Sequence, residues 1–134
     1  MKGLVALAAT LASWAQAVAA EEGMDGAALY QQNCASCHGT ELQGQPDWRS
    51  LGPDGRLPAP PHDATGHTWH HGDDILFRIT REGTAAVVGG GYESDMPGFG
   101  DSLSDAEIRA ILDYIKSTWP ERERTYQRER TRQE

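Results

Sequence analysis

Positive charge and aromatic side chains are both scarce in this sequence of 134 residues. It contains 12 Lys and Arg against 20 Asp and Glu, a formal net charge of −8. Phosphate binding needs a basic surface, so this balance excludes nucleic acid as the main partner. Aromatic residues make up 7% and hydrophobic residues 38%, which allows a modest apolar core in a single domain. We therefore expect something other than a large core to help to hold the fold.

Long apolar runs are absent except at the N-terminus, in residues 1–20. There, Lys2 precedes an apolar run that ends in the small residues Val18–Ala20, a pattern typical of a signal peptide cleaved before Glu21. The alternative is an uncleaved membrane anchor, but the run is short for a span and is interrupted by polar residues. No cysteine lies near the cleavage point, which disfavours a lipoprotein. We expect a periplasmic or otherwise exported protein that meets a membrane only through a partner complex or an uncleaved signal anchor.

The chain has two cysteines, and both lie in the run Cys34–Ala35–Ser36–Cys37–His38. A redox-active dithiol would normally occur in a βαβ pattern, and no strand-rich pattern surrounds these residues. A zinc site would usually need a second Cys/His pair at matching spacing. C-x-x-C-H is the signature of covalent haem attachment, and an exported chain suits that chemistry. We therefore predict one haem c bound through Cys34 and Cys37.

Haem attachment accounts for the spacing of this motif. Each thiol adds to one vinyl group, so the two sulfurs must lie about one helical turn apart. The imidazole of His38 then reaches the iron from the same side. Gly39 removes a side chain where the backbone passes close to the porphyrin. The attached haem would also give a small domain a large apolar body.

Three helices are predicted, separated by long loops. The first covers residues 25–37, with Asp25 as N-cap, and the second covers 73–81, with Gly83 as its stop. The third begins at a capping box, Ser104–Glu107, and continues to the stop at Pro120. Its apolar stripe consists of Ile108, Ile111, Leu112 and Ile115. Gly and Pro make the stretch 40–66 irregular.

Composition divides the exported part of the chain into two regions. Residues 21–119 carry a formal charge of −10 and are predicted to form one domain. Residues 120–134 contain five Arg and four Glu and carry +1. We predict that this segment is a solvated, frayed tail. The alternative is a docking segment for an acidic partner.

The ligand opposite His38 would decide what the haem does, and it can be Met, His or an open position. Met24 lies too close to Cys34 in the sequence to cross the ring. Met96 lies in a Gly/Pro-rich loop before the last predicted helix. A lone Met more often fills a core, but acidic residues precede Met96 and Pro97 follows it, which is a poor setting for core filling. We predict axial ligation by His38 and Met96, which suits electron transfer.

Four histidines lie within ten residues: His62, His67, His70 and His71. They can be surface or loop residues, with one or two bonding the backbone or a haem propionate. The alternatives are a second metal site, for copper or zinc, or replacement of Met96 as ligand.

Several other residues are candidates for holding the haem and its ligand. Trp48 or Trp69, together with Arg49 or Arg56, could hydrogen-bond the propionates. A carbonyl from the proline-rich run 58–61 could accept the Nδ1–H of His38 and fix its ring.

Three features together resemble a class I monohaem c-type cytochrome over roughly residues 25–119. They are Cys34–Gly39 near a first helix, Ser94–Pro97 late in the chain, and a terminal helix over 103–119. The resemblance implies a small, all-α fold of about three to five helices with long loops around one haem. It also implies that the first and last helices cross, with ligation by His38 and Met96 and one-electron transfer. The residues brought together at the crossing would be Gly26, Leu29 and Tyr30 with Ile108, Leu112 and Ile115.

Three function classes remain open from the sequence. The leading hypothesis is an exported electron carrier whose acidic body docks a redox partner with a basic patch. The second is an enzyme or sensor with an accessible iron. The third is a haem subunit of a larger oxidoreductase or respiratory complex, including one that handles copper through the histidines between His62 and His71.

Overall fold

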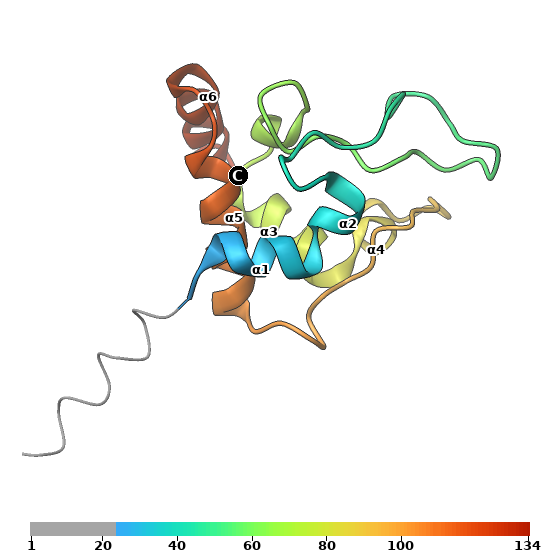
Figure 1. Cartoon of the computed structure of the whole chain (residues 1–134), viewed down its shortest axis with the longest axis horizontal. Coiled ribbons are helices and arrows are strands. Elements are labelled where there is room, and N and C mark those ends of the chain that lie inside the picture. Colours follow the sequence, from blue (N-terminus) through green and yellow to red (C-terminus); the bar gives the residue numbers. More distant parts are fainter. Residues whose placement is uncertain (1–23) are drawn as a thin grey trace, which may run out of the picture.

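A computed structural model describes residues 24–134, so the expected signal segment 1–20 lies outside the described residues. The described residues fold into helices and loops and contain no β-strand (Figure 1). The helices are α1 (Gly26–Asn33), α2 (Ala35–His38), η1 (Thr68–His70), α3 (Asp73–Glu82), α4 (Thr84–Val88), α5 (Asp105–Ser117) and α6 (Glu121–Thr131). The predicted all-α fold is confirmed, with more helices than the three to five expected. None of the described helices is long and apolar enough to cross a membrane.

The first predicted helix is divided into two. Asp25 caps α1 as predicted, because its side chain accepts hydrogen bonds from the amides of Ala27 and Ala28. The helix ends at Cys34, whose φ of −118° departs from helical geometry, and α2 begins one residue later. The turn that carries Cys37 and His38 is therefore oriented separately from α1.

The crossing of α1 and α5 forms the core, as Figure 1 shows at the left of the view. The predicted capping box of α5 is present, and its four predicted apolar residues are buried. At the crossing point Gly26 lies against the backbone carbonyl of Ala110, where a Cβ atom would collide. The ring of Tyr30, which is fully buried, lies 5.6 Å from the ring of Tyr114. The predicted crossing of α1 with α5 is confirmed.

The second predicted helix, α3, ends at Gly83 as expected, because Gly83 has φ 91° and a side chain is disfavoured there. The loop that carries Met96 returns to this end of α3. The amides of Phe99 and Gly100 donate to the carbonyls of Thr80 and Arg81 at 2.9 and 3.0 Å. The position of this loop is thus set by α3.

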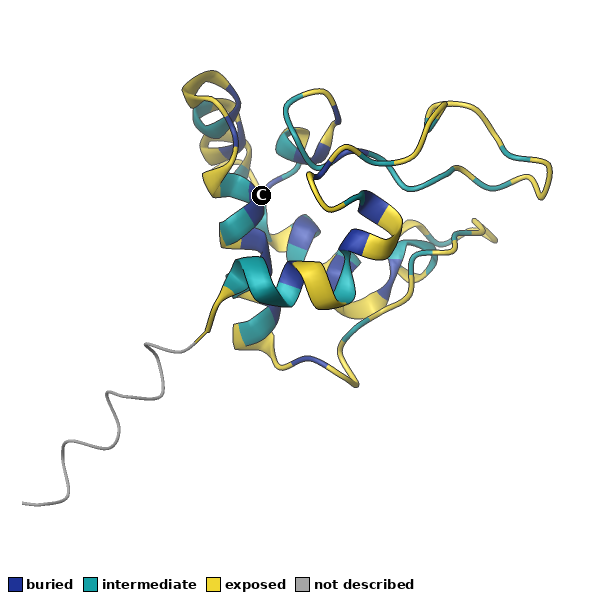
Figure 2. Cartoon of the chain, viewed as in Figure 1, coloured by how far each residue is buried: buried dark blue, intermediate teal, exposed yellow. Residues whose placement is uncertain are grey.

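The prediction of a solvated, frayed tail over residues 120–134 was wrong. Most of this segment is α6, which packs on η1 (Figure 1). Arg, Glu and Gln are good helix formers, Glu residues occupy the first turn, and Arg residues occupy the last. One side of the helix, with Glu123 and Gln127, is buried (Figure 2). The strongly charged composition therefore did not reveal that this segment forms a helix that packs on η1.

The long stretch between α2 and η1 is irregular, as predicted. Its two legs run side by side and reach out to the right in Figure 1. They are joined near their base by a hydrogen bond from the amide of Gln45 to the carbonyl of Ala59 (2.9 Å). The amide of His62 donates to the carbonyl of Leu42 at 2.8 Å, which brings the returning leg to the end of α2.

Candidate haem-binding site

The two cysteines lie at the junction of α1 and α2, and both thiols are free. Cys34 is half-buried and Cys37 is exposed. Burial raises the pKa of the Cys34 thiol to about 11, and the neighbouring Cys37 adds to the effect. In the absence of a metal ion, Cys34 is therefore a neutral thiol at pH 7. This state suits the formation of a thioether to an apolar group.

His38 is buried at the end of α2 and has a defined tautomer. Its Nδ1 lies 2.8 Å from the carbonyl oxygen of Pro60, and since a carbonyl can only accept, Nδ1 carries the proton. Burial lowers the pKa of His38, so the imidazole is neutral and Nε2 has a free lone pair. The expected acceptor from the run 58–61 is thus Pro60. A neutral ring held through Nδ1 is the usual arrangement of a metal-ligating histidine.

A second imidazole, from His62, stacks on that of His38. The ring centroids are 3.9 Å apart and the planes differ by 26°. The Nδ1 of His62 is 2.7 Å from the Oγ1 of Thr68, and its carbonyl accepts a 2.7 Å bond from the indole N–H of Trp119. Because the His62 ring stacks on the His38 ring, His62 lies on the His38 side of the site, which disfavours His62 as the replacement for Met96. Replacement of Met96 by one of the other histidines stays a prediction.

The remaining histidines do not converge on a metal site. His67 stacks on Trp48, and the His70 ring lies tilted against Trp69. The rings of His71 and His67 meet edge to face, with their centroids 5.7 Å apart. Residues 24–134 contain no group of three His, Cys, Asp or Glu side chains that could hold a metal ion. The described geometry therefore gives no support to the alternative of a second copper or zinc site at the histidines from His62 to His71.

Met96 lies half-buried in the loop between α4 and α5. Its amide donates to the Oγ of Ser94 at 3.2 Å, and its carbonyl lies close to Gly83. The residue is outside the apolar core built around the α1–α5 crossing. It is therefore not core filler, and its role as the second axial ligand stays a prediction.

Arg56 differs from the other propionate candidates in having an unfilled buried donor. One guanidinium nitrogen pairs with Asp95, but the buried Nε–H has no partner among the described residues. Arg49 instead lies over the ring of Trp48, and the indole N–H of Trp69 donates to a backbone carbonyl at 3.3 Å. Arg56 borders an open pocket of about 480 Å³. A buried N–H without an acceptor is costly, so the site fits an anionic oxygen such as that of a haem propionate.

Two contacts at this site were not foreseen from the sequence. The hydroxyl of Tyr30 donates to the carbonyl of Gly39 at 2.8 Å, which anchors the end of α2 to α1. Trp119 fixes the backbone at His62, although 57 residues separate the two. No local pattern signals either pairing, because each joins separate segments of the chain.

Comparison with known proteins gives two findings. The family model described as Cytochrome c matches residues 23–119. The chain is also similar to a curated protein from Azospirillum brasilense, the Cbb3-type cytochrome c oxidase subunit CcoP. The two are 35% identical over 101 residues, which is 74% of this chain. The chain spans 28% of the length of that relative. The matched residues end at Trp119, so α6 lies outside the family model.

Proposed function

The chain belongs to the cytochrome c family, and we propose that it carries single electrons on one haem c attached through Cys34 and Cys37. His38 and Met96 would be the axial ligands. When bound, such a haem supplies an iron that cycles between Fe(II) and Fe(III). The single C-x-x-C-H motif in the printed sequence supports one haem.

The observation that carries this proposal is the state of His38. Its proton is held on Nδ1 by Pro60, so Nε2 is available as a donor directly after the two free thiols. The buried ring, the Pro60 carbonyl and the stacked His62 leave the imidazole little freedom to rotate. A ligand that is fixed before the electron arrives needs little rearrangement, which suits rapid transfer.

Met96 is supported as the second ligand by its setting and its chemistry. The loop is fixed to α3 by backbone hydrogen bonds, while the side chain belongs to no apolar cluster. A thioether paired with a histidine favours the reduced iron. Arg56 pairs with Asp95, which precedes Met96, and its Nε–H, which has no acceptor among the described residues, would donate to a propionate.

We also propose that the protein is exported and that its partner is a redox protein with a basic docking patch. The N-terminal pattern supports export, and the charge of −10 over residues 21–119 supports such a partner. The similarity to an oxidase subunit favours a second candidate, in which the chain is a subunit or partner of a respiratory oxidase. Copurification of the chain with an oxidase complex would support this second candidate.

Optical spectra of the ferric and ferrous protein, with and without carbon monoxide, test the ligand set. We expect no carbon monoxide binding by the native ferrous protein at neutral pH and a ferric methionine-to-iron charge-transfer band. Met96→Ala should abolish that band, lower the reduction potential and admit carbon monoxide. Met24→Ala is the matched control, because Met24 precedes α1 and is 39% exposed. An unchanged band and potential in Met96→Ala would reject Met96 as ligand.

A second experiment tests the docking proposal. The rate at which a partner with a basic patch reduces the protein should fall as ionic strength rises, because salt screens the attraction between the surfaces. A rate that does not depend on salt would contradict a basic docking patch without affecting the ligand assignment.

A further inference from the structure

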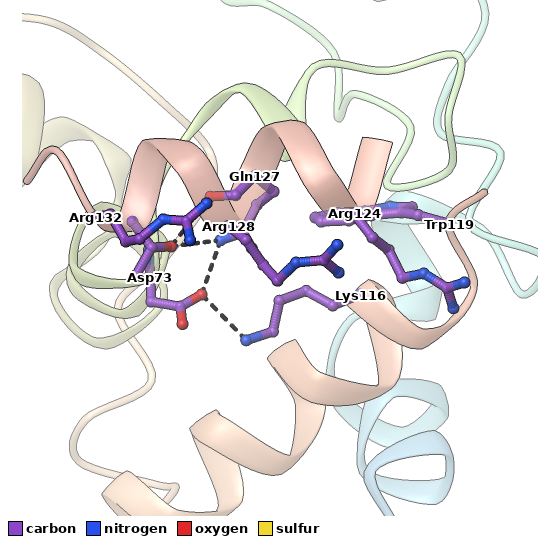
Figure 3. Close-up of a pocket in the computed structure, with 8 residues that line it drawn as sticks. Asp73, Lys116, Trp119, Arg124, Gln127, Arg128 and Arg132 are labelled. Atoms are coloured by element: carbon purple, nitrogen blue, oxygen red, sulfur yellow. Dashed lines mark hydrogen bonds and ion pairs between the residues drawn. The ribbon is translucent and has the colours of Figure 1, made fainter. Parts of the chain in front are cut away.

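A groove with a basic wall lies between α5 and α6, away from the two cysteines. Its volume is about 420 Å³, and Trp119 forms part of its floor. Lys116 lines it from α5, Arg124 and Arg128 line it from α6, and Arg132 lines it from the C-cap of α6. Figure 3 shows the Lys116 and Arg128 side chains in the space between the two helices.

The arginines of this groove are spread along α6 and its C-cap. Arg124, Arg128 and the C-cap residue Arg132 are four residues apart, so their Cα atoms span about 12 Å along the axis. The guanidinium groups of Arg124 and Arg128 both bond the carboxylate of Glu121, and Arg132 lies one turn further along the chain. Arginines spread over this length match several carboxylates along an extended segment better than they match a single small anion.

The guanidinium groups keep donors for an incoming ligand. Arg124 and Arg128 each use only Nη2 in their bonds to Glu121, at 2.9 Å. Arg132 forms no ion pair with the residues that the structure describes. A guanidinium has five N–H donors and binds carboxylates through paired hydrogen bonds. Lys116 differs, because it is already held by Asp73 and Asp113 at 3.0 Å.

The charge of this region opposes that of the domain beside it. Residues 120–134 carry +1 and residues 21–119 carry −10, so a broad anionic surface such as a lipid bilayer would be repelled by most of the molecule. A narrow acidic segment that enters the groove reaches the arginines and meets less of that repulsion. The groove therefore favours a peptide over a membrane.

We propose that the groove between α5 and α6 docks an extended acidic segment of a partner protein, with its carboxylates paired to Arg132 and to the remaining donors of Arg124 and Arg128. This surface differs from the acidic one proposed for the redox partner. The proposal uses no haem ligand, so it does not depend on the proposed ligation.

The test uses purified holo-protein and a synthetic peptide of four Glu-Ser repeats, followed by calorimetry and by NMR of the Trp119 indole N–H. The peptide should bind and shift that resonance, and its affinity should fall as the salt concentration rises. Arg132→Gln should weaken binding by about tenfold, since a hydrogen bond between charged groups is lost. Arg122→Gln is the matched control, because it makes the same charge change on the same helix outside the groove, and it should change affinity less than about twofold. Circular dichroism should show the same helix content in both variants.

Five results would overturn the proposal. One is an absence of peptide binding, and another is equal weakening by Arg132→Gln and Arg122→Gln, which would indicate general charge attraction. If the protein binds phosphatidylglycerol vesicles, this binding needs Arg132, and the peptide does not bind, the groove is a membrane-binding site. Self-association at low salt that Arg132→Gln abolishes while the peptide fails would assign it to a second copy. Inorganic phosphate serves as the small-anion probe, and if it bound as tightly as the peptide, a linear ligand would be rejected.

Discussion

Different interactions stabilise the domain matched by the cytochrome c family and the attachment of α6, the helix that follows it. At the α1–α5 crossing, apolar side chains interdigitate around Tyr30 and Ile108, both fully buried. At the contact of α6 with η1 and α3, polar groups dominate: Gln127 donates to Asp73 at 2.8 Å and to the carbonyl of His71 at 3.3 Å. Apolar burial stabilises roughly in proportion to area, whereas each polar contact adds a small and geometry-dependent increment. The two regions should therefore respond to mutation on different scales.

The largest effect is expected from a cavity in the apolar region. Ile108→Ala removes a fully buried side chain from α5 and should lower the free energy of unfolding by about 2–5 kcal/mol. Urea denaturation of the holo-protein measures this. Val88→Ala is the control, because Val88 is 57% exposed on α4 and should lose less than about 0.5 kcal/mol. Equal losses would mean that the crossing is not the main source of stability.

Closing the gap at the crossing should have the next largest effect. In Gly26→Ala the new methyl group would meet the carbonyl oxygen of Ala110, so α1 and α5 must separate. We expect a loss of about 1–3 kcal/mol, measured in the same denaturation experiment. Ala is the better helix former by about 1 kcal/mol, so without the collision the substitution would stabilise the protein. The sign of the change therefore tests the close approach directly.

A smaller loss is expected where the two regions join. Trp119→Phe keeps an aromatic ring but removes the indole N–H that donates to the carbonyl of His62. Loss of this hydrogen bond should cost about 1 kcal/mol of stability. Hydrogen exchange should rise in residues 62–73 and in α6 before it rises at the α1–α5 crossing. Uniform acceleration in both regions would indicate that they do not respond separately.

The smallest effect concerns the charged face of α6 and depends on pH. Hydrogen bonds from Arg128, Arg124 and Thr125 lower the pKa of Glu121 from 4.5 to about 2. A carboxylate with a lowered folded-state pKa stabilises the fold above pH 4.5, and this contribution is lost as the pH falls toward 2. Glu121→Gln removes that dependence. Thermal melts followed by far-UV circular dichroism between these pH values should therefore show a steeper decline in the native protein than in the variant, and parallel profiles would contradict the assignment.

The sequence predicted those parts of the molecule that depend on neighbouring residues. The capping box at Ser104, the stop at Gly83 and the C-x-x-C-H turn are each written within a few positions, and each was found where expected. The break at Cys34 was missed, because helix propensity continues across it. The contact of Trp119 with His62 was missed as well, because no local rule relates residues so far apart.

The helix α6 shows a different limit of sequence reasoning. Its alternating Glu and Arg residues have the composition of a solvated tail, since few of them are apolar. What distinguishes it is the position of Gln127 and Tyr126, which meet polar and aromatic groups around η1. Composition averages over a segment, whereas packing depends on which few side chains face the neighbour.

The ion pair between Arg56 and Asp95 has a consequence for the loop that bears Met96. It joins the 40–66 stretch to Asp95, the residue that precedes Met96, although 39 positions separate the two partners in the sequence. Both side chains are accessible, with 37% and 65% exposed, so dissolved ions screen and weaken this ion pair. In concentrated electrolyte this loop would become more mobile while the helices stayed folded, so the proposed Met96 ligand would weaken before the proposed His38 ligand.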